Sequence, residues 1–243
     1  MDDPHGLWTD IANYLRRIAN NLPETPKAIL LVSAHWETDG FAFTGTKTPD
    51  LIYDYYGFPA HTYELAYPVP GNPALAERAT TLLRDAGMKA AVDVERGHDH
   101  GVFIPLMLAF PDAQIPVVEM SLDASLDPAL HAAAGQALAP LRDEGVLIIG
   151  SGMSFHNMRA YGDPRATGPS QAFDAALTDA VLSSPDDRAA KLARWQDMDA
   201  ARFSHPREEH LIPLMVAAGA GDAGEKTFDA LVLQTAISGF SFK

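Results

Sequence analysis

ILLVSAHWET, the segment Ile29–Thr38, is a run of aliphatic residues that ends in polar and aromatic ones. A short run rich in Ile, Leu and Val predicts a strand buried inside a parallel sheet. His35 lies where the aliphatic run ends, which is where ligands bind in α/β sheets. Trp36 offers an apolar wall there, and Glu37 offers a carboxylate that can fix the imidazole tautomer. We therefore interpret His35 as a candidate ligand, with a structural histidine as the alternative.

Similar runs along the chain predict further strands, and amphipathic or apolar runs between them predict helices. The strands are expected at 27–33, 41–44, 90–95, 116–122, 146–150 and 230–237. The helices are expected at 7–20, 73–86, 102–109, 128–143, 170–183, 187–198 and 206–219. This alternation is typical of an α/β fold with a central, mainly parallel sheet and helices on both faces. The sequence contains no repeat or long linker, so we expect a single domain over residues 1–243.

The composition limits the class of protein. The formal charge of −14 argues against nucleic acid as a partner. The sequence lacks an apolar run near the ~20 residues of a membrane span and lacks the pattern of a signal peptide, so we expect a soluble, cytoplasmic protein that binds no membrane. There are no cysteines, so any metal must be held by His, Asp or Glu, which suit non-haem iron, zinc or manganese.

His98 and His100 flank Asp99 in the segment RGHDHGVFIPL, which precedes a helix-like run. Two histidines in this spacing can bind a metal ion directly. On a loop the same residues can instead cap the helix, with side chains that accept hydrogen bonds from its first N–H groups. The residues alone leave both interpretations open.

The segment SGMSFHNMR comes after a predicted strand and leads to His156 and Asn157. Gly150 and Gly152 are direct neighbours of Ser151, so the segment does not match the G-x-S-x-G pattern of a nucleophile elbow. The glycines favour a sharp turn, and we expect His156 and Asn157 to point into a cleft. A histidine in a solvent-facing loop is the alternative.

The segment FSHPREEHLIPLMVAAGAG changes from charged to wholly apolar at His210. Pro206 suits the first position of a helix, and Glu208 and Glu209 then fall in its first turn, where the helix dipole favours carboxylates. His210 is expected where this charged turn meets the core. A histidine at such a position must be hydrogen-bonded or bound to a metal.

Five segments carry a resemblance to a known family: ILLVSAHWET, YPVPGNPALA, GHDHGVFIPLMLAFPDAQIPVVEMSL, GSGMSFHNMR and HPREEHLIPLM. In this order they resemble the class III extradiol ring-cleavage dioxygenases, in particular the DOPA-dioxygenase-like branch of the LigB superfamily. The resemblance extends over residues 27 to 220. It implies one non-haem Fe(II), sometimes replaced by zinc on isolation, at the end of the central sheet. It also implies a reaction that opens a catechol ring next to its two hydroxyls with O₂.

Carried onto this chain, the resemblance implies His35 and His210 as metal ligands, with Glu209 as the alternative at the late position. It implies His156 as the acid/base and His100 as a histidine that lines the substrate pocket. The further candidates are Glu37 beside the metal, and Trp36, His98 and Asn157 in the pocket. Ring nitrogens of His35 and His210 should then lie ~2.0–2.1 Å from one ion. His156 should lie beside that ion without ligating it, because a base must reach the substrate.

The family's first ligand belongs to an N-terminal strand with an HGGGP-like loop after it, and this sequence has neither. Its start, MDDP, resembles the residues that come directly after that loop in the family, and His5 is the first candidate to complete the site. We therefore expect weak metal occupancy. We also expect an open edge beside KAILLVS, residues 27–33, or beside whichever strand the absent one would pair with.

Two other functions stay open on the sequence alone. A zinc-dependent hydrolase could use His35, His98, His100 and His210, with Glu37 or Glu209 to position water. A noncatalytic member of the family could keep the fold with an incomplete site. For the dioxygenase, the expected partners are a small aromatic diol and O₂, and Tyr53, Tyr55 and Tyr56 are aromatic candidates for the pocket wall. The identity of the catechol, the bond cleaved and the choice between monomer and homodimer are not determined by the sequence.

Overall fold

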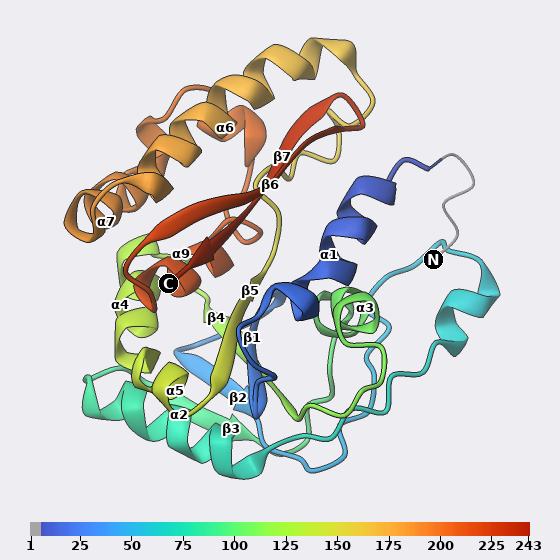
Figure 1. Ribbon diagram of the computed structural model, residues 1–243, viewed down its shortest axis with the longest axis vertical. Helices are drawn as coiled ribbons and strands as arrows, with labels where there is room; N and C mark the ends of the chain where they lie inside the picture. Colours follow the sequence, from blue (N-terminus) through green and yellow to red (C-terminus); the bar gives the residue numbers. More distant parts are fainter. Residues whose placement is uncertain (1–5) are drawn as a thin grey trace. The chain divides into compact units, whose positions relative to one another are not determined.

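The computed structural model describes residues 6–243, which fall into two compact units (Figure 1). Within the described residues, unit 1 comprises residues 6–124 and Pro140–Ser151, and unit 2 comprises Ser125–Ala139 and Gly152–Lys243. His5 lies outside the described residues, and the expectation of one domain stays a prediction.

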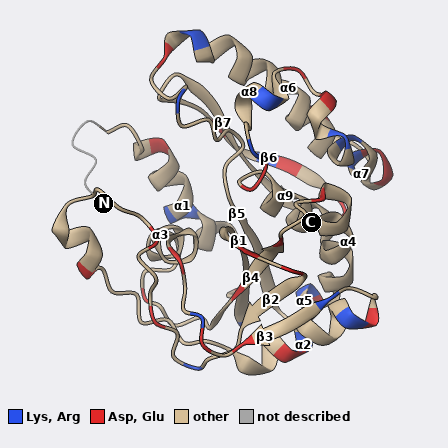
Figure 2. Ribbon diagram, turned by 180° about the vertical axis from the view of Figure 1, so that it is seen from behind, with Lys and Arg blue, Asp and Glu red and all other residues tan. Residues whose placement is uncertain are grey.

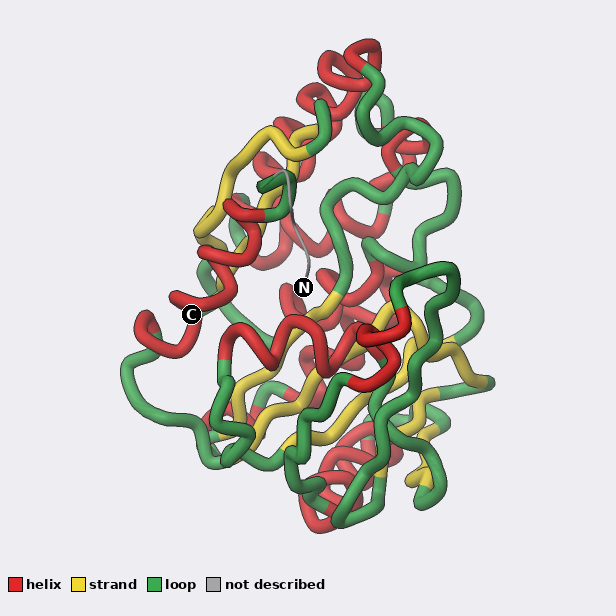
Figure 3. Tube along the Cα trace, turned by 90° about the vertical axis from the view of Figure 1, so that its right-hand side faces the viewer, coloured by secondary structure: helices red, strands yellow, loops and turns green. Residues whose placement is uncertain are grey.

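Unit 1 contains a five-stranded sheet with the strand order β3-β2-β4-β1-β5. The pairs β1–β4, β1–β5 and β2–β3 are parallel, and β2–β4 is antiparallel. The α/β class and the mainly parallel sheet are thus confirmed, and Figure 3 shows the strands side by side in yellow. The strands are β1 (Ala28–Thr38), β2 (Phe41–Thr44), β3 (Ala90–Asp93), β4 (Val117–Asp123) and β5 (Val146–Ser151).

β1 lies inside the sheet, so the expectation of an open edge beside KAILLVS is wrong. β4 pairs with one side of β1 and β5 with the other, and the edge strands of this sheet are β3 and β5. The four residues from Ile29 to Val32 are fully buried. A strand covered on both faces needs such a continuous aliphatic run, because its side chains point alternately to the two faces.

Helices cover both faces of this sheet. On one face, α1 (Thr9–Asn21) packs against α3 (His100–Ala109), and both contribute to a core with Ile29, Leu31 and Val117. α2 (Pro73–Asp85) contacts β2, β3 and β4, and the short α5 (Pro140–Asp143) contacts β5. A short 3₁₀ helix, η1, covers Ala60–Glu64. The predicted helices at 7–20, 73–86 and 102–109 are confirmed within a few residues.

Unit 2 consists of helices and a two-stranded antiparallel hairpin. α4 packs against α9, and α6 packs against α7, α8 and both strands of the hairpin. Its elements are α4 (Pro128–Leu138), η2 (Pro164–Ala166), α6 (Thr167–Leu182), α7 (Pro185–Ala193), η3 (Trp195–Asp197), α8 (Ala201–Ser204), α9 (Ile212–Gly219), β6 (Gly224–Val232) and β7 (Thr235–Phe242).

Two predicted elements of unit 2 are wrong. The predicted strand 230–237 contains the turn of the β6–β7 hairpin, where Leu233 and Gln234 have φ of 49° and 66°. The predicted helix 206–219 begins only at Ile212, and the residues before it form turns, so Pro206 is not a first helical residue. These turns are held by the carbonyl of Glu208, which accepts hydrogen bonds from the N–H groups of Leu211 and Ile212.

Charged residues of both signs lie on α2 and α7, as the blue and red segments of Figure 2 show. In α7 the acidic residues Asp186 and Asp187 lie in the first turn and Lys191 lies in the last, as the helix dipole favours. Within residues 6–243, no helix combines the length and the apolar character needed to cross a bilayer.

The close packing of α4 on α9 gives a first prediction. A Cβ added at Gly135 would lie 2.1 Å from the carbonyl oxygen of Val216, and one at Gly219 would lie 2.1 Å from that of Ala132. Gly135→Ala should therefore force the two helices apart and lower the free energy of unfolding by about 1–3 kcal/mol, measured by urea denaturation. The control is Gly168→Ala in α6, where an added Cβ meets no atom within 4 Å. The Gly168→Ala substitution should leave the free energy of unfolding unchanged or raise it by up to about 1 kcal/mol. Equal stability of the two variants would contradict the packing.

Candidate functional site

The end of β1 carries His35 into a cluster with Asp54 and His100, which we call the first histidine cluster. β1 loses its regular register with β4 between Val32 and Glu37, and such irregularities often redirect a side chain next to a functional site. His100 is the first residue of α3, and Asp54 lies in the loop after β2. All three residues belong to unit 1.

One carboxylate holds both imidazoles of this cluster. Asp54 Oδ2 lies 3.0 Å from His35 Nδ1, and Asp54 Oδ1 lies 2.7 Å from His100 Nδ1. The backbone N–H of His100 donates a third hydrogen bond to Asp54 Oδ1 at 3.0 Å. Burial alone would raise the pKa of Asp54, but the hydrogen bonds from His100 and His35 outweigh it and hold that pKa well below its ordinary value. The two rings meet edge to face with centroids 3.9 Å apart.

One aromatic side chain, Tyr55, packs against His100 and belongs to a group of aromatic residues. The ring of Tyr55 meets the imidazole of His100 edge to face at 5.5 Å, and Tyr55 also contacts Tyr53, Phe58 and Tyr63. These residues come from the same loop as Asp54 and from η1. Tyr56 lies on the surface with 91% of its area exposed. Of the tyrosines predicted for a pocket wall, Tyr55 lies beside the first histidine cluster and Tyr53 contacts Tyr55, whereas Tyr56 is exposed.

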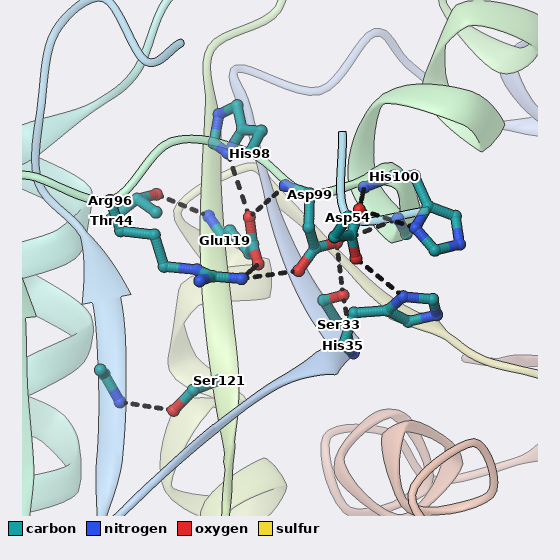
Figure 4. A network of polar contacts seen from close by, with 12 residues as sticks. Ser33, His35, Thr44, Asp54, Arg96, His98, Asp99, His100, Glu119 and Ser121 are labelled. Carbon is teal, nitrogen blue, oxygen red and sulfur yellow. Dashed lines mark hydrogen bonds and ion pairs between the residues drawn. The ribbon is translucent and has the colours of Figure 1, made fainter. Parts of the chain in front are cut away.

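A buried polar network lies behind the first histidine cluster (Figure 4). Asp99, the N-cap of α3, accepts hydrogen bonds from the hydroxyl of Ser33 at 2.8 Å, the N–H of Gly101 at 2.9 Å and the guanidinium of Arg96 at 3.0 Å. Its own N–H donates to Glu119 Oε2 at 3.2 Å. Asp99 therefore caps the helix, which was one of the two interpretations of this segment.

His98 belongs to this buried network. It is fully buried, and its Nδ1 lies 3.4 Å from Glu119 Oε2. Burial lowers the pKa of His98 to about 4, against a smaller opposite effect of Asp99. Burial also raises the pKa of Glu119 well above its ordinary value, and Asp99 adds to that rise. His98 thus lies inside the core beside Glu119.

Unit 2 contains a second histidine cluster made of His156, Glu209 and His210. Glu209 Oε1 lies 2.9 Å from His210 Nδ1 and 3.5 Å from His156 Nδ1, and the two imidazoles stack with centroids 3.3 Å apart. Arg207 approaches the other carboxylate oxygen of Glu209 at 3.5 Å. Burial alone would raise the pKa of Glu209, but the contacts with His156 and His210 outweigh it and hold that pKa far below its ordinary value.

Close backbone contacts hold the second histidine cluster. A Cβ added at Gly152 would lie 2.2 Å from the carbonyl oxygen of His210, so only glycine allows this approach. The same carbonyl accepts a hydrogen bond from the N–H of Met153 at 2.9 Å, and the N–H of His156 donates to the carbonyl of Ser204 at 3.0 Å. The glycine-rich turn predicted after Ser151 therefore brings the two histidine segments together.

Three other candidate residues lie around these clusters. Trp36 is buried, and the guanidinium of Arg96 lies 4.4 Å from its ring centroid. Glu37 lies further along β1, and the carboxylate at His35 Nδ1 is that of Asp54. Asn157 uses its amide locally, because it donates to the carbonyl of Phe203 and accepts from the N–H of Arg159.

The donor sets of both clusters fit a metal ion. In each cluster the candidate ligand atoms all lie within 4.8 Å of one another, and imidazole with carboxylate suits iron and zinc. His35 and His210 belong to different units, so the prediction that they share one ion stays a prediction. Asp54 is the residue that sequence reasoning missed. Its one signal was an acid among the aromatic residues of YDYYGF.

Comparisons with known proteins agree on one family. The family model described as the catalytic LigB subunit of aromatic ring-opening dioxygenase matches residues 2–239. The chain is 42% identical to dioxygenase tasH of Hapsidospora irregularis, over 85% of this chain and 68% of that protein. It is 43% identical to a 4,5-DOPA dioxygenase extradiol of Beta vulgaris, over 85% and 77% of the two chains. It is 39% identical to the Escherichia coli protein named 4,5-DOPA dioxygenase extradiol, over 86% and 78%.

A solved structure also matches most of the chain. It is the crystal structure of an uncharacterized protein, JW3007, from Escherichia coli K12. The two folds align with a TM-score of 0.79 and 30% sequence identity, over 95% of this chain and 91% of the other. The likeness therefore extends to the fold.

The raised pKa of Glu119 gives a second prediction. The unfolded chain releases this proton near the ordinary pKa of 4.5, whereas the folded protein retains it to higher pH. Between these two pKa values the stability falls as the pH rises. Glu119→Gln removes this titration, so the variant should gain stability relative to the parent from about pH 5 to about pH 8, by at most about 1.4 kcal/mol per pH unit.

Urea unfolding of both proteins at the two pH values measures this difference. The control is Glu77→Gln, which removes an exposed carboxylate from α2 and should change stability by less than about 0.5 kcal/mol. If the difference between Glu119→Gln and the parent is the same at both pH values, Glu119 does not hold its proton in the folded protein.

Proposed function

Because the chain belongs to the LigB family of aromatic ring-opening dioxygenases, we propose that it opens a catechol-type ring with O₂ in a reaction that depends on non-haem Fe(II). Homologues at about 40% identity are named dioxygenases, so the chain is a member of an extradiol enzyme family. The proposal adds the metal, the substrate class and the roles of individual residues. Both atoms of O₂ enter the ring-opened product.

The grouping of histidines supports these roles. The resemblance in sequence points to His35, His100, His156 and His210, and these are the four histidines of the two clusters. Of the other histidines in the described residues, His98 and His205 are buried, His131 bonds to a helix carbonyl, and His61 is exposed. The four histidines that the resemblance gives as ligands, acid/base and pocket histidine are thus the histidines of the two clusters, and this observation supports the proposal.

In the proposed mechanism, His35 and His210 would hold the iron through ring nitrogens. When bound, Fe(II) would supply open positions where both catechol oxygens and O₂ can bind. His156 takes the proton of a substrate hydroxyl at Nε2 and later returns one, because its Nδ1 faces Glu209 at 3.5 Å. His100 offers a hydrogen-bonding Nε2 to the substrate, and the ring of Tyr55 packs edge to face against its imidazole.

Anaerobic loading with Fe(II), followed by a catechol and then air, tests the function. We expect a yellow ring-opened product and the uptake of one O₂ per ring. Activity with zinc alone on ester or amide substrates, without O₂ uptake, would favour a hydrolase instead. A protein that binds iron and a catechol without turnover would favour a noncatalytic role.

A third prediction separates ligands from the acid/base. His35→Ala and His210→Ala should each lower the iron content at equilibrium, measured by metal analysis after dialysis. His156→Ala should keep the iron and lower kcat by about 10²–10⁴-fold, the usual contribution of general acid/base catalysis. The control is His61→Ala, which changes an exposed histidine of η1 and should match the parent. Loss of iron in His156→Ala would make His156 a ligand.

A further inference from the structure

In each histidine cluster one carboxylate contacts two imidazoles, and both contacts are made at Nδ1. In the first cluster the two oxygens of Asp54 lie 3.0 Å from His35 Nδ1 and 2.7 Å from His100 Nδ1. Asp54 comes from a loop 19 residues after His35 and 46 residues before His100. Only the tertiary structure brings the three residues together.

The chemistry of the two groups fixes where the ring protons lie. An ionised carboxylate only accepts hydrogen bonds, so each imidazole that it contacts must carry its proton on Nδ1. In a neutral imidazole, the lone pair then lies on Nε2, which is the nitrogen available to a metal ion or a substrate hydroxyl. The third bond to Asp54, from the backbone N–H of His100, fixes the carboxylate against the start of α3.

We propose that Asp54 is a positioning residue that holds His35 and His100 in the tautomer with the proton on Nδ1 and the lone pair on Nε2, and is not itself a metal ligand. This inference rests on the proposed function, in which His35 binds the iron and His100 contacts the substrate. A carboxylate at the far nitrogen of a ligating histidine orients the ring and raises its basicity. Here a single carboxylate does this for a ligand and for a pocket histidine together.

The second cluster repeats the arrangement in the other unit. Glu209 Oε1 lies 2.9 Å from Nδ1 of His210, the proposed ligand, and 3.5 Å from Nδ1 of His156, the proposed acid/base. Glu209 and Asp54 thus occupy equivalent chemical positions, although one comes after α8 and the other after β2. The same inference makes Glu209 a positioning residue and His210 the late ligand.

The tautomers are tested on the metal-free protein by ¹⁵N NMR of the imidazole nitrogens, with signals assigned by their loss in His35→Gln and His100→Gln. In the parent, both rings should carry the proton on Nδ1. In Asp54→Ala this preference should disappear from both rings. In Asp54→Asn the side chain keeps one acceptor and gains a donor, so only one ring should keep its proton on Nδ1. An unprotonated Nδ1 in the parent, or unchanged tautomers in Asp54→Ala, would overturn the inference.

Iron affinity is measured on the same proteins by anaerobic titration with Fe(II). Asp54→Ala should weaken binding by roughly 10–100-fold, as is usual for the loss of such a partner, and Asp54→Asn should weaken it less. The matched control is Asp39→Asn, an exposed carboxylate paired with Lys89, which should bind like the parent. Urea unfolding of each variant checks that it is folded.

The two measurements separate the inference from the proposed function. Loss of iron in Asp54→Ala with unchanged tautomers would make Asp54 a ligand and overturn the positioning role. A parent protein with both Nδ1 protons in place and no affinity for Fe(II) would support the positioning role and refute the iron-dependent function.

Discussion

The first histidine cluster depends on the hydrogen bonds of one buried carboxylate, that of Asp99. A buried carboxylate is costly unless donors surround it, and Asp99 receives hydrogen bonds from Ser33, Gly101 and Arg96. Ser33 lies two residues before His35, and Asp99 lies one residue before His100. These bonds therefore join the end of β1 to the start of α3, and they bring the two imidazoles within reach of one carboxylate.

The same constraint explains the glycine at the start of α3. A Cβ at Gly101 would lie 2.6 Å from Ser33 Oγ and 3.0 Å from Asp99 Oδ1. Any side chain there would push apart the hydroxyl and the carboxylate that join the two elements. The HDHG motif is thus a structural unit as well as a source of histidines, because its aspartate, its second histidine and its glycine serve one junction.

Sequence reasoning predicted well the features that depend on local pattern, such as the aliphatic strands and the histidines at their ends. It failed where tertiary contacts determine the local backbone conformation or bring distant residues together. The turn at Leu233 and Gln234 lacks the glycine or asparagine that usually marks positive φ, so two strands were interpreted as one. Pro206 suggested a helix start, but the residues before Ile212 form turns in which the carbonyl of Glu208 accepts hydrogen bonds from the N–H groups of Leu211 and Ile212. Asp54 has only a weak local signal, an acid among aromatic residues, because its role depends on two histidines that are distant in sequence.

The balance of buried charge explains why a proton belongs on Glu119. Asp99 and Glu119 are both fully buried, and Arg96 is the guanidinium that both contact. His98 does not supply a second positive charge at neutral pH, because burial lowers its pKa to about 4. Two carboxylate charges would thus exceed one cation in a medium where unpaired charge is costly. A proton on Glu119 removes the excess charge, while Asp99, which joins β1 to α3, keeps the hydrogen bonds from Ser33 and Gly101.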